Sequence, residues 1–158
     1  MDFSFTPEQE TFRQELRAWL AVNVPSSAQE LRHLQPQASA EDLNFLKSWQ
    51  RQVHTGGWTG ISWPKEYGGQ NARPMEQAIV ADEMARSNSP AAVNYLGIAL
   101  VGPTLIHHGT HEQKTRYLKK ILTAEEIWCQ LFSEPNAGSD LASMKTRARR
   151  SGGDWLIS

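Results

Sequence analysis

The sequence predicts an α+β protein: an all-α N-terminal helical bundle followed by the first strands of an antiparallel β-barrel-like domain. Apolar residues recur at helical spacing in five segments before residue 125. After that point, short runs of aromatic and aliphatic residues alternate with turn-forming residues, which is typical of strands. We therefore divide the chain into an N-terminal helical domain, 1–125, and the incomplete start of a middle β domain, 126–158.

Start and stop signals support each helix. The first and fifth helices open with a capping box, in which a threonine is followed three residues later by a glutamine. A proline begins the third helix, and a glycine pair ends the second. Pro103 is expected to kink or split the fourth helix, which we predict to be mostly buried. The expected helices cover residues 6–24, 39–55, 74–87, 91–108 and 110–122.

The connections differ in character. Residues 26–38 are polar, and we expect a surface connection there, with or without a short helical turn. Residues 57–69 contain glycines, Pro64 and three large aromatic residues, which predicts an ordered loop held by its own side chains. Strands are expected at 127–132, 144–150 and 154–157, the last two joined by a Ser-Gly-Gly turn. A sheet that ended at Ser158 would leave an apolar unpaired edge, so we expect the natural protein to continue.

Composition narrows the possible functions. Hydrophobic residues make up 39% and charged residues 21% of 158 residues, as in folded globular proteins. The net charge of -1 gives no basis for binding nucleic acid or an anionic membrane. The single cysteine, Cys129, excludes an internal disulfide and a multi-cysteine metal site. The first residues do not resemble a secretory signal or a transit peptide, and we expect a reduced, cytoplasmic setting.

The polar loop from Ser133 to Asp140 carries the most specific pattern. Gly138 permits a positive φ or a close backbone approach, and Ser133 and Ser139 offer hydroxyl groups. Such a loop can receive an anionic or hydrogen-bonding ligand. An ordinary strand followed by Asx and serine turns would produce the same residues, and the physical pattern alone leaves both readings open.

The residues Ser133-Glu134-Pro135 and Ala137-Gly138-Ser139-Asp140 resemble the signature of the acyl-CoA dehydrogenase family. Asn136 departs from that signature, in which glycine is common, but asparagine tolerates left-handed backbone angles. The order of helices, the loop 63–69 and the start of a β domain resemble the family as well. The similarity covers essentially the whole chain and less than half of a full-length member.

The resemblance implies FAD as the cofactor. One edge of the flavin would lie against the segment 130–133, with main-chain groups on the pyrimidine edge and the Ser133 hydroxyl near N5. Gly138 and Ser139 would lie at the cofactor phosphates, and Ser139 would also approach acyl-CoA. The implied cofactor-binding residues are Gln130, Leu131, Phe132, Ser133, Gly138 and Ser139.

The implied reaction is α,β-dehydrogenation of an acyl-CoA thioester in fatty acid or lipid metabolism, with electrons passed to an electron-transfer flavoprotein. Relatives assemble as homo- or hetero-oligomers. The family's base is a glutamate of a C-terminal domain, so we assign no catalytic residue within this sequence. Glu134 and Asp140 are expected to cap backbone amides. Two alternatives stay open: an acyl-CoA oxidase or flavin monooxygenase of the same fold, and a non-catalytic helical partner-binding module.

Other candidate features have simpler explanations. His107, His108 and His111 are expected to serve helix ends and a turn, and we assign no metal site. The cations at 145–150 are expected on a solvated strand face, with CoA phosphates as a weaker alternative. The segment 94–100 resembles the family's acyl-pocket helix, although core packing alone would give a similar sequence.

Overall fold

The computed structural model describes residues 4–26 and 39–158, so nearly all of the connection expected at 26–38 lies outside the described residues. The chain forms two compact units, one ending at Trp128 and the other spanning Cys129–Ser158. The first unit is helical, and the second contains an antiparallel strand pair. The predicted fold class is therefore confirmed, while the domain boundary at residue 125 stays a prediction.

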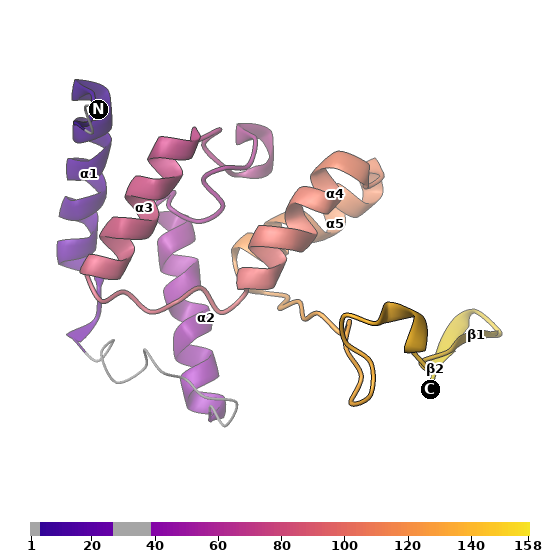
Figure 1. The fold of residues 1–158 in the computed structure, drawn as a ribbon. Coiled ribbons are helices and arrows are strands. Elements are labelled where there is room, and N and C mark those ends of the chain that lie inside the picture. The colour runs from indigo at the N-terminus through magenta and orange to yellow at the C-terminus, as the bar shows by residue number, and fades with distance from the viewer. Residues whose placement is uncertain (1–3, 27–38) are drawn as a thin grey trace. The chain divides into compact units, whose positions relative to one another are not determined.

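Among its described residues, the first unit contains five α-helices and a π-helical turn (Figure 1). Helix α1 packs along α3, and α5 contacts both α4 and α2. A single 3₁₀ turn, Lys65–Tyr67, interrupts the loop between α2 and α3. The elements are α1 (Pro7–Asn23), α2 (Ala40–Thr55), α3 (Pro74–Arg86), the π-helical turn Gly97–Val101, α4 (Gly102–His108) and α5 (His111–Leu122).

Local capping explains where three of these helices begin. Thr6, Ser39 and Thr110 each accept a hydrogen bond from the backbone N–H three residues ahead, and the side chain at that third position accepts one in return. Each reciprocal pair satisfies two backbone donors that a helix terminus would otherwise leave without partners. The starts predicted for the first, second and fifth helices are confirmed.

The core of the first unit is centred on Trp63, which the loop 57–69 inserts against α5. Trp63 is buried with Leu118, Ile121 and Leu122, and Tyr67 packs against this cluster. The predicted ordered loop is therefore confirmed, because its own tryptophan is part of the core. A second buried set, Leu16, Leu20 and Ile79, lies where α1 meets α3.

The expected helix 91–108 is the main difference from prediction in this unit. It is not mostly buried, since Tyr95 and Leu100 are exposed, and it begins late and contains the π-helical turn. Pro103 has no N–H to donate to the preceding turn. The carbonyl of Ile98 instead accepts a hydrogen bond from Trp63 Nε1 at 3.1 Å. Gly102 faces the same indole ring so closely that a Cβ there would overlap it.

Two buried amides join α2, the fourth helical segment and the end of α5. Gln50 Nε2 donates to the carbonyls of Ile121 and Leu122, both at 3.0 Å, and Gln50 Oε1 accepts from the Asn94 N–H. Asn94 Nδ2 donates to the carbonyls of Ile121 and Glu126. The bonds to Ile121 and Leu122 supply side-chain donors to carbonyls in the last turn of α5, where the helical pattern of backbone bonds ends.

The second unit contains the hairpin of β1 (Ala148–Ser151) and β2 (Asp154–Ile157), whose register pairs Ala148 with Ile157 and Ser151 with Asp154. Gly152 has a φ of 63°, which suits the tight turn between them. The strand predicted at 144–150 begins later than expected. The strand predicted at 127–132 is wrong: that segment has no hydrogen-bonded neighbouring strand among the described residues.

Candidate functional site

The loop after residue 133 is closed by a compact turn. The Glu134 N–H donates to the Ala137 carbonyl at 2.8 Å, and the Ala137 N–H donates back to the Glu134 carbonyl at 3.1 Å. Ala137 is buried within the turn. Asn136 does not have a positive φ, so the turn forms without the left-handed asparagine that the sequence permits.

The Glu134 carboxylate ties this turn to the approach of β1. It accepts hydrogen bonds from the Thr146 N–H at 2.7 Å and from the Lys145 N–H at 2.9 Å. The Thr146 side chain is the largest influence that holds the pKa of Glu134 below its ordinary value, and the backbone N–H groups of Lys145 and Thr146 lower it further. The predicted capping role is confirmed for Glu134. Asp140 differs, because its backbone carbonyl, rather than its carboxylate, accepts from Ser143.

The predicted flavin-facing segment 130–133 has no regular secondary structure and is exposed. Leu131 and Phe132 are 85% and 69% exposed, respectively. Within the described part of the chain, no backbone hydrogen bond engages any residue from Gln130 to Ser133. Its N–H and C=O groups are therefore open to pairing with another group, as main-chain recognition of a ring edge requires.

Gly138 and Ser139 lie just beyond the turn and are exposed. A Cβ built on Gly138 would meet no atom within 4 Å, and its φ is not positive. Neither packing nor backbone conformation within the described chain therefore calls for glycine at this position. A missing side chain leaves room for another molecule to approach the backbone, so these residues fit the phosphate-facing role implied for FAD.

The first unit contains a cavity of about 550 Å³ between α2, α3, the loop 57–62 and the segment 89–98. Its walls include the rings of Trp49, Trp58 and Tyr95. The volume lies within the range of small-molecule pockets. Residues of the segment 94–100, which resembles the family's acyl-pocket helix, differ in their surroundings. Tyr95 lines the cavity, whereas Asn94 is fully buried and takes part in the hydrogen bonds that link it to Gln50, Ile121 and Glu126.

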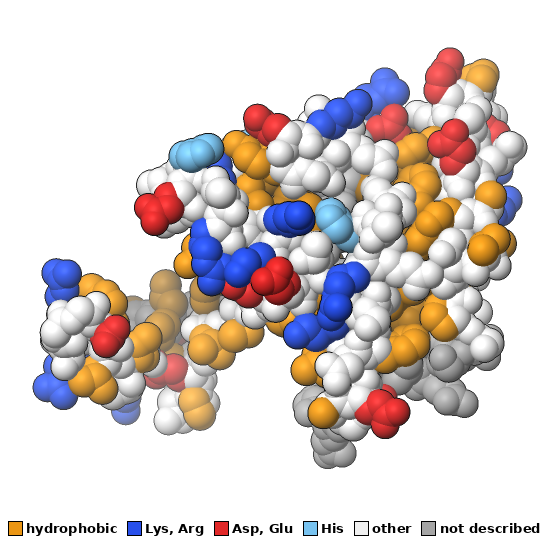
Figure 2. All heavy atoms as spheres, turned by 180° about the vertical axis from the view of Figure 1, so that it is seen from behind, with side chains coloured by type: hydrophobic (Ala, Val, Ile, Leu, Met, Phe, Trp, Pro, Cys, Tyr) orange, Lys and Arg blue, Asp and Glu red, His pale blue; other side chains and the backbone are white. Residues whose placement is uncertain are grey.

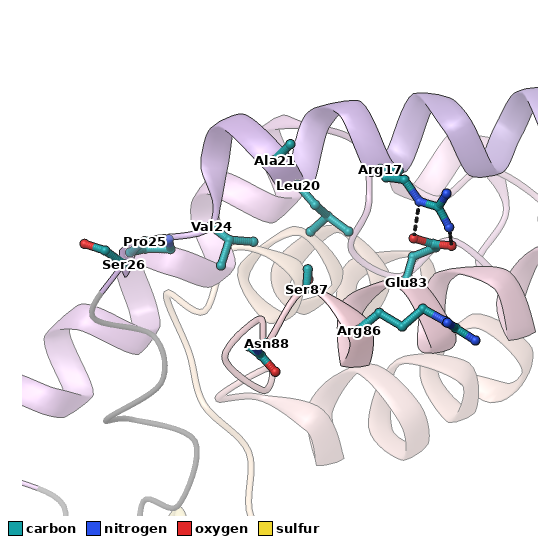
Figure 3. A pocket seen from close by; sticks show the side chains of 10 residues that line it. All are labelled: Arg17, Leu20, Ala21, Val24, Pro25, Ser26, Glu83, Arg86, Ser87 and Asn88. Atoms are coloured by element: carbon teal, nitrogen blue, oxygen red, sulfur yellow. Dashed lines mark hydrogen bonds and ion pairs between the residues drawn. The ribbon is translucent and has the colours of Figure 1, made fainter.

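A second hollow, of about 740 Å³, lies between α1 and α3 (Figure 3). Its charged side chains are already paired within the chain. The Arg17 guanidinium donates to both Glu83 oxygens, with Nε–Oε2 at 2.9 Å and Nη2–Oε1 at 2.5 Å. Arg86 likewise donates to Asp82 at 2.6 Å. Since these charges satisfy one another, this hollow is a weaker candidate for ligand binding than the cavity beside α2.

A third hollow, of about 550 Å³, borders His54 and the start of α5. Burial, with a smaller contribution from Lys119, lowers the pKa of His54. His54 Nδ1 is itself buried and has no hydrogen-bond partner among the described residues. The site therefore favours a neutral imidazole.

Charges of both signs are intermixed on the face that Figure 2 shows, with hydrophobic side chains between them. The described residues contain no group of three His, Cys, Asp or Glu side chains arranged to hold a metal ion. His107 and His108 stand at the end of α4, and His111 begins α5, as predicted. In the described ranges, no helix has the length and apolar character needed to cross a bilayer.

The sequence patterns did not identify Trp58 and Thr59 as binding residues. Each lines the cavity beside α2, and each has a buried polar side-chain atom without a hydrogen-bond partner in the described chain. Only the concentration of aromatic residues in the loop 57–69 hints at their environment, and that pattern suits core packing equally well. The absence of a partner depends on tertiary contacts, which no local pattern encodes.

Comparison with known proteins identifies the relationship. Residues 6–125 match the family described as "Acyl-CoA dehydrogenase, N-terminal domain". The chain is 42% identical over 142 residues to acyl-CoA dehydrogenase IpdE1 of Mycolicibacterium smegmatis, covering 89% of this chain and 36% of the relative. It is 37% identical to acyl-CoA dehydrogenase FadE26 of Mycobacterium tuberculosis, covering 99% and 38%.

The fold agrees with this relationship. The ChsE4–ChsE5 complex from Mycobacterium tuberculosis contains a chain with a TM-score of 0.78 and 36% identity, covering 99% of this chain and 38% of that one. The Tcur3481–Tcur3483 steroid ACAD gives the same TM-score and identity, covering 99% and 39%. The chain thus spans less than two-fifths of the length of these relatives. On the match over residues 6–125, the chain belongs to the acyl-CoA dehydrogenase family.

Proposed function

We propose that this chain forms the N-terminal part of an FAD-dependent enzyme that carries out α,β-dehydrogenation of an acyl-CoA thioester. Family membership supports the reaction class. The observation that carries the assignment to this chain is the free backbone edge of residues 130–133, followed by the turn at Glu134. An exposed edge with unpaired donors and acceptors suits the rim of a flat heterocycle.

Individual residues then have distinct tasks. Bound FAD supplies the acceptor for the hydride that leaves the β carbon. Gln130, Leu131 and Phe132 present main-chain groups to the pyrimidine edge of the ring. The Ser133 hydroxyl donates toward N5, where negative charge develops. Gly138 and Ser139 admit the phosphates, and Ser139 also contacts acyl-CoA.

The substrate class and the partners form a finer part of the proposal. One similar structure is described as a steroid ACAD and another as a ChsE4–ChsE5 complex. We propose a steroid-bearing acyl-CoA as substrate, assembly as a hetero-oligomer, and electron transfer to an electron-transfer flavoprotein in the cytoplasm. The aromatic walls of the cavity beside α2 are compatible with a ring-bearing substrate, but the assignment rests on the relatives.

The test uses the product of the entire reading frame that encodes this sequence. We expect the purified product to carry flavin, and a steroid-bearing acyl-CoA to bleach its visible absorbance faster than octanoyl-CoA does in anaerobic stopped flow. A flavin-free product that stays inert toward both thioesters, yet binds a partner chain, would support the non-catalytic module instead. Rapid reoxidation of reduced flavin by oxygen would support the oxidase or monooxygenase alternative.

Ser133→Ala examines the assigned site within that product. We expect flavin reduction to slow by up to about 10²-fold, because a donor near the developing charge is lost. Ser151→Ala, an exposed serine of the hairpin, is the matched control and should leave the rate unchanged. Equal reduction rates for Ser133→Ala and the unaltered protein would remove Ser133 from the flavin site.

A further inference from the structure

We propose that Asn94 is a positioning residue for the flavin-facing segment 130–133, because its side-chain amide fixes the point from which that segment leaves the helical unit. The inference rests on the function proposed above and adds a residue to which that function gave no task. Asn94 is fully buried, so it acts through the backbone that it holds and not by contact with the cofactor.

The Asn94 amide holds the chain that follows α5 at two points. Its Nδ2 donates to the Glu126 carbonyl at 2.8 Å, and its Oδ1 accepts the Trp128 N–H at 2.9 Å. The same Nδ2 donates to the Ile121 carbonyl at 3.0 Å. Both ends of one buried amide are therefore engaged, and together they join the last turn of α5 to the residues that lead out of the helical unit.

Trp128 depends on this side chain because no strand takes its place. Trp128 belongs to no helix or strand, and no backbone carbonyl of the described residues accepts its N–H. Its ring meets that of Tyr117 edge-on, with centroids 5.4 Å apart. The backbone and the ring of Trp128 are thus both held against the helical unit, the backbone by Asn94 and the ring by α5.

The anchored residue lies close to the flavin-facing segment along the chain. Gln130 follows Trp128 by two residues, so their Cα atoms are at most about 7 Å apart whatever path the chain takes. The segment 130–133 has no backbone hydrogen bond of its own among the described residues. The freedom of its first main-chain groups therefore depends on how firmly Trp128 is held. An anchor formed before FAD binds reduces the conformational entropy that binding costs.

Gly97 leaves the room that the Asn94 amide occupies. It is buried in the π-helical turn, and a Cβ built on it would overlap the Oδ1 and Nδ2 atoms of Asn94. The φ of Gly97 is not positive, so the backbone conformation does not itself call for glycine there. The close packing of the amide does, which makes Gly97 a second residue on which the position of Asn94 depends.

Asn94→Leu in the product of the entire reading frame tests this role, because leucine is similar in size and forms no hydrogen bonds. We expect the dissociation constant of FAD to rise about tenfold, since backbone that is loosened in the free protein must be ordered on binding. In the flavin-free protein, the Trp128 N–H should exchange with deuterium about tenfold faster or more. Gln50→Leu is the matched control, because Gln50 donates to Ile121 and Leu122 but to no described residue beyond them. Both quantities should then stay within about twofold of their original values.

Gly97→Ala keeps the amide but displaces it, so it should change both quantities in the same direction as Asn94→Leu. Gly153→Ala, in the exposed turn of the hairpin, is its control and should change neither, because the added Cβ would meet no atom within 4 Å. Circular dichroism verifies that each variant is folded. A flavin-free unaltered product would overturn the proposed function, and this inference with it. If the unaltered product binds FAD and Asn94→Leu binds it equally well, or if Gln50→Leu weakens it as much, the role of Asn94 alone is overturned.

Discussion

At the scale of single residues, hydrogen bonds from side-chain amides hold segments that apolar packing alone would not fix. Asn94 Oδ1 accepts the Trp128 N–H at 2.9 Å, while its Nδ2 serves two carbonyls. The sequence does not distinguish Asn94 or Gln50 from surface amides, because helical periodicity marks polar positions as exposed. Their burial follows from contacts between distant segments.

Asn94→Ala should lower the free energy of unfolding by about 2–4 kcal/mol, since it leaves buried backbone groups without partners. Urea denaturation of the chain measures the change. Asn44→Ala, at an exposed position on α2, is the control and should change the value by less than about 0.5 kcal/mol. Equal effects of the two substitutions would show that the hydrogen bonds of Asn94 do not stabilise the folded chain.

His54 should make stability depend on pH. Its pKa is lowered in the folded chain from the ordinary value of 6.5, so the unfolded chain binds a proton more readily. The stabilising contribution is complete above that ordinary value and is lost as the pH falls through it toward the folded pKa. Urea midpoints measured between about pH 5 and 7 should therefore decline with acidification. In His54→Gln the decline should be smaller, and an unchanged slope would contradict the assignment.

At the scale of elements, local signals determined most helix starts. Capping boxes and proline at the first turn are short-range patterns, so they survive in the sequence and predict where α1, α2, α3 and α5 begin. The π-helical turn was not predictable in the same way. It depends on Trp63, thirty-five residues from Ile98 in sequence, donating to the carbonyl of that residue.

Thr110→Ala tests how much the N-cap residue of α5 contributes to the stability of the chain. It removes the hydroxyl that accepts the Gln113 N–H, and we expect a loss of about 1 kcal/mol of unfolding free energy. Thr110→Ser should retain most of the stability, because serine caps equally well. Thr115→Ala, in the exposed middle of α5, should be neutral or slightly stabilising. A Thr110→Ala variant as stable as Thr115→Ala would argue against the cap.

At the scale of the whole molecule, the order of the helices and the β1–β2 hairpin were predictable, but the structure of the run 127–132 was not. The aromatic and aliphatic run 127–132 has the composition of a strand, yet strand formation requires a neighbour, which is a non-local property. The candidate flavin residues within that run follow from family resemblance rather than from periodicity. Their placement in an exposed, unpaired segment could not be inferred from composition.

The chain alone should retain little or no FAD after purification. The segment 130–133 is exposed and offers one edge of contact, whereas tight ligand sites bury most of the ligand surface. Visible absorbance of the purified chain, followed by titration with added FAD, measures this. Stoichiometric flavin in the isolated chain would mean that these residues and their neighbours already enclose the cofactor.

The close approach of Gly102 to the Trp63 indole constrains how related sequences can diverge. Any side chain at position 102 would overlap the Trp63 ring. A larger residue at position 102 therefore requires a smaller residue at position 63. Across descendants of a common ancestor, these two sites should therefore covary. Glycine should accompany a bulky aromatic, and alanine or serine should appear beside a smaller partner.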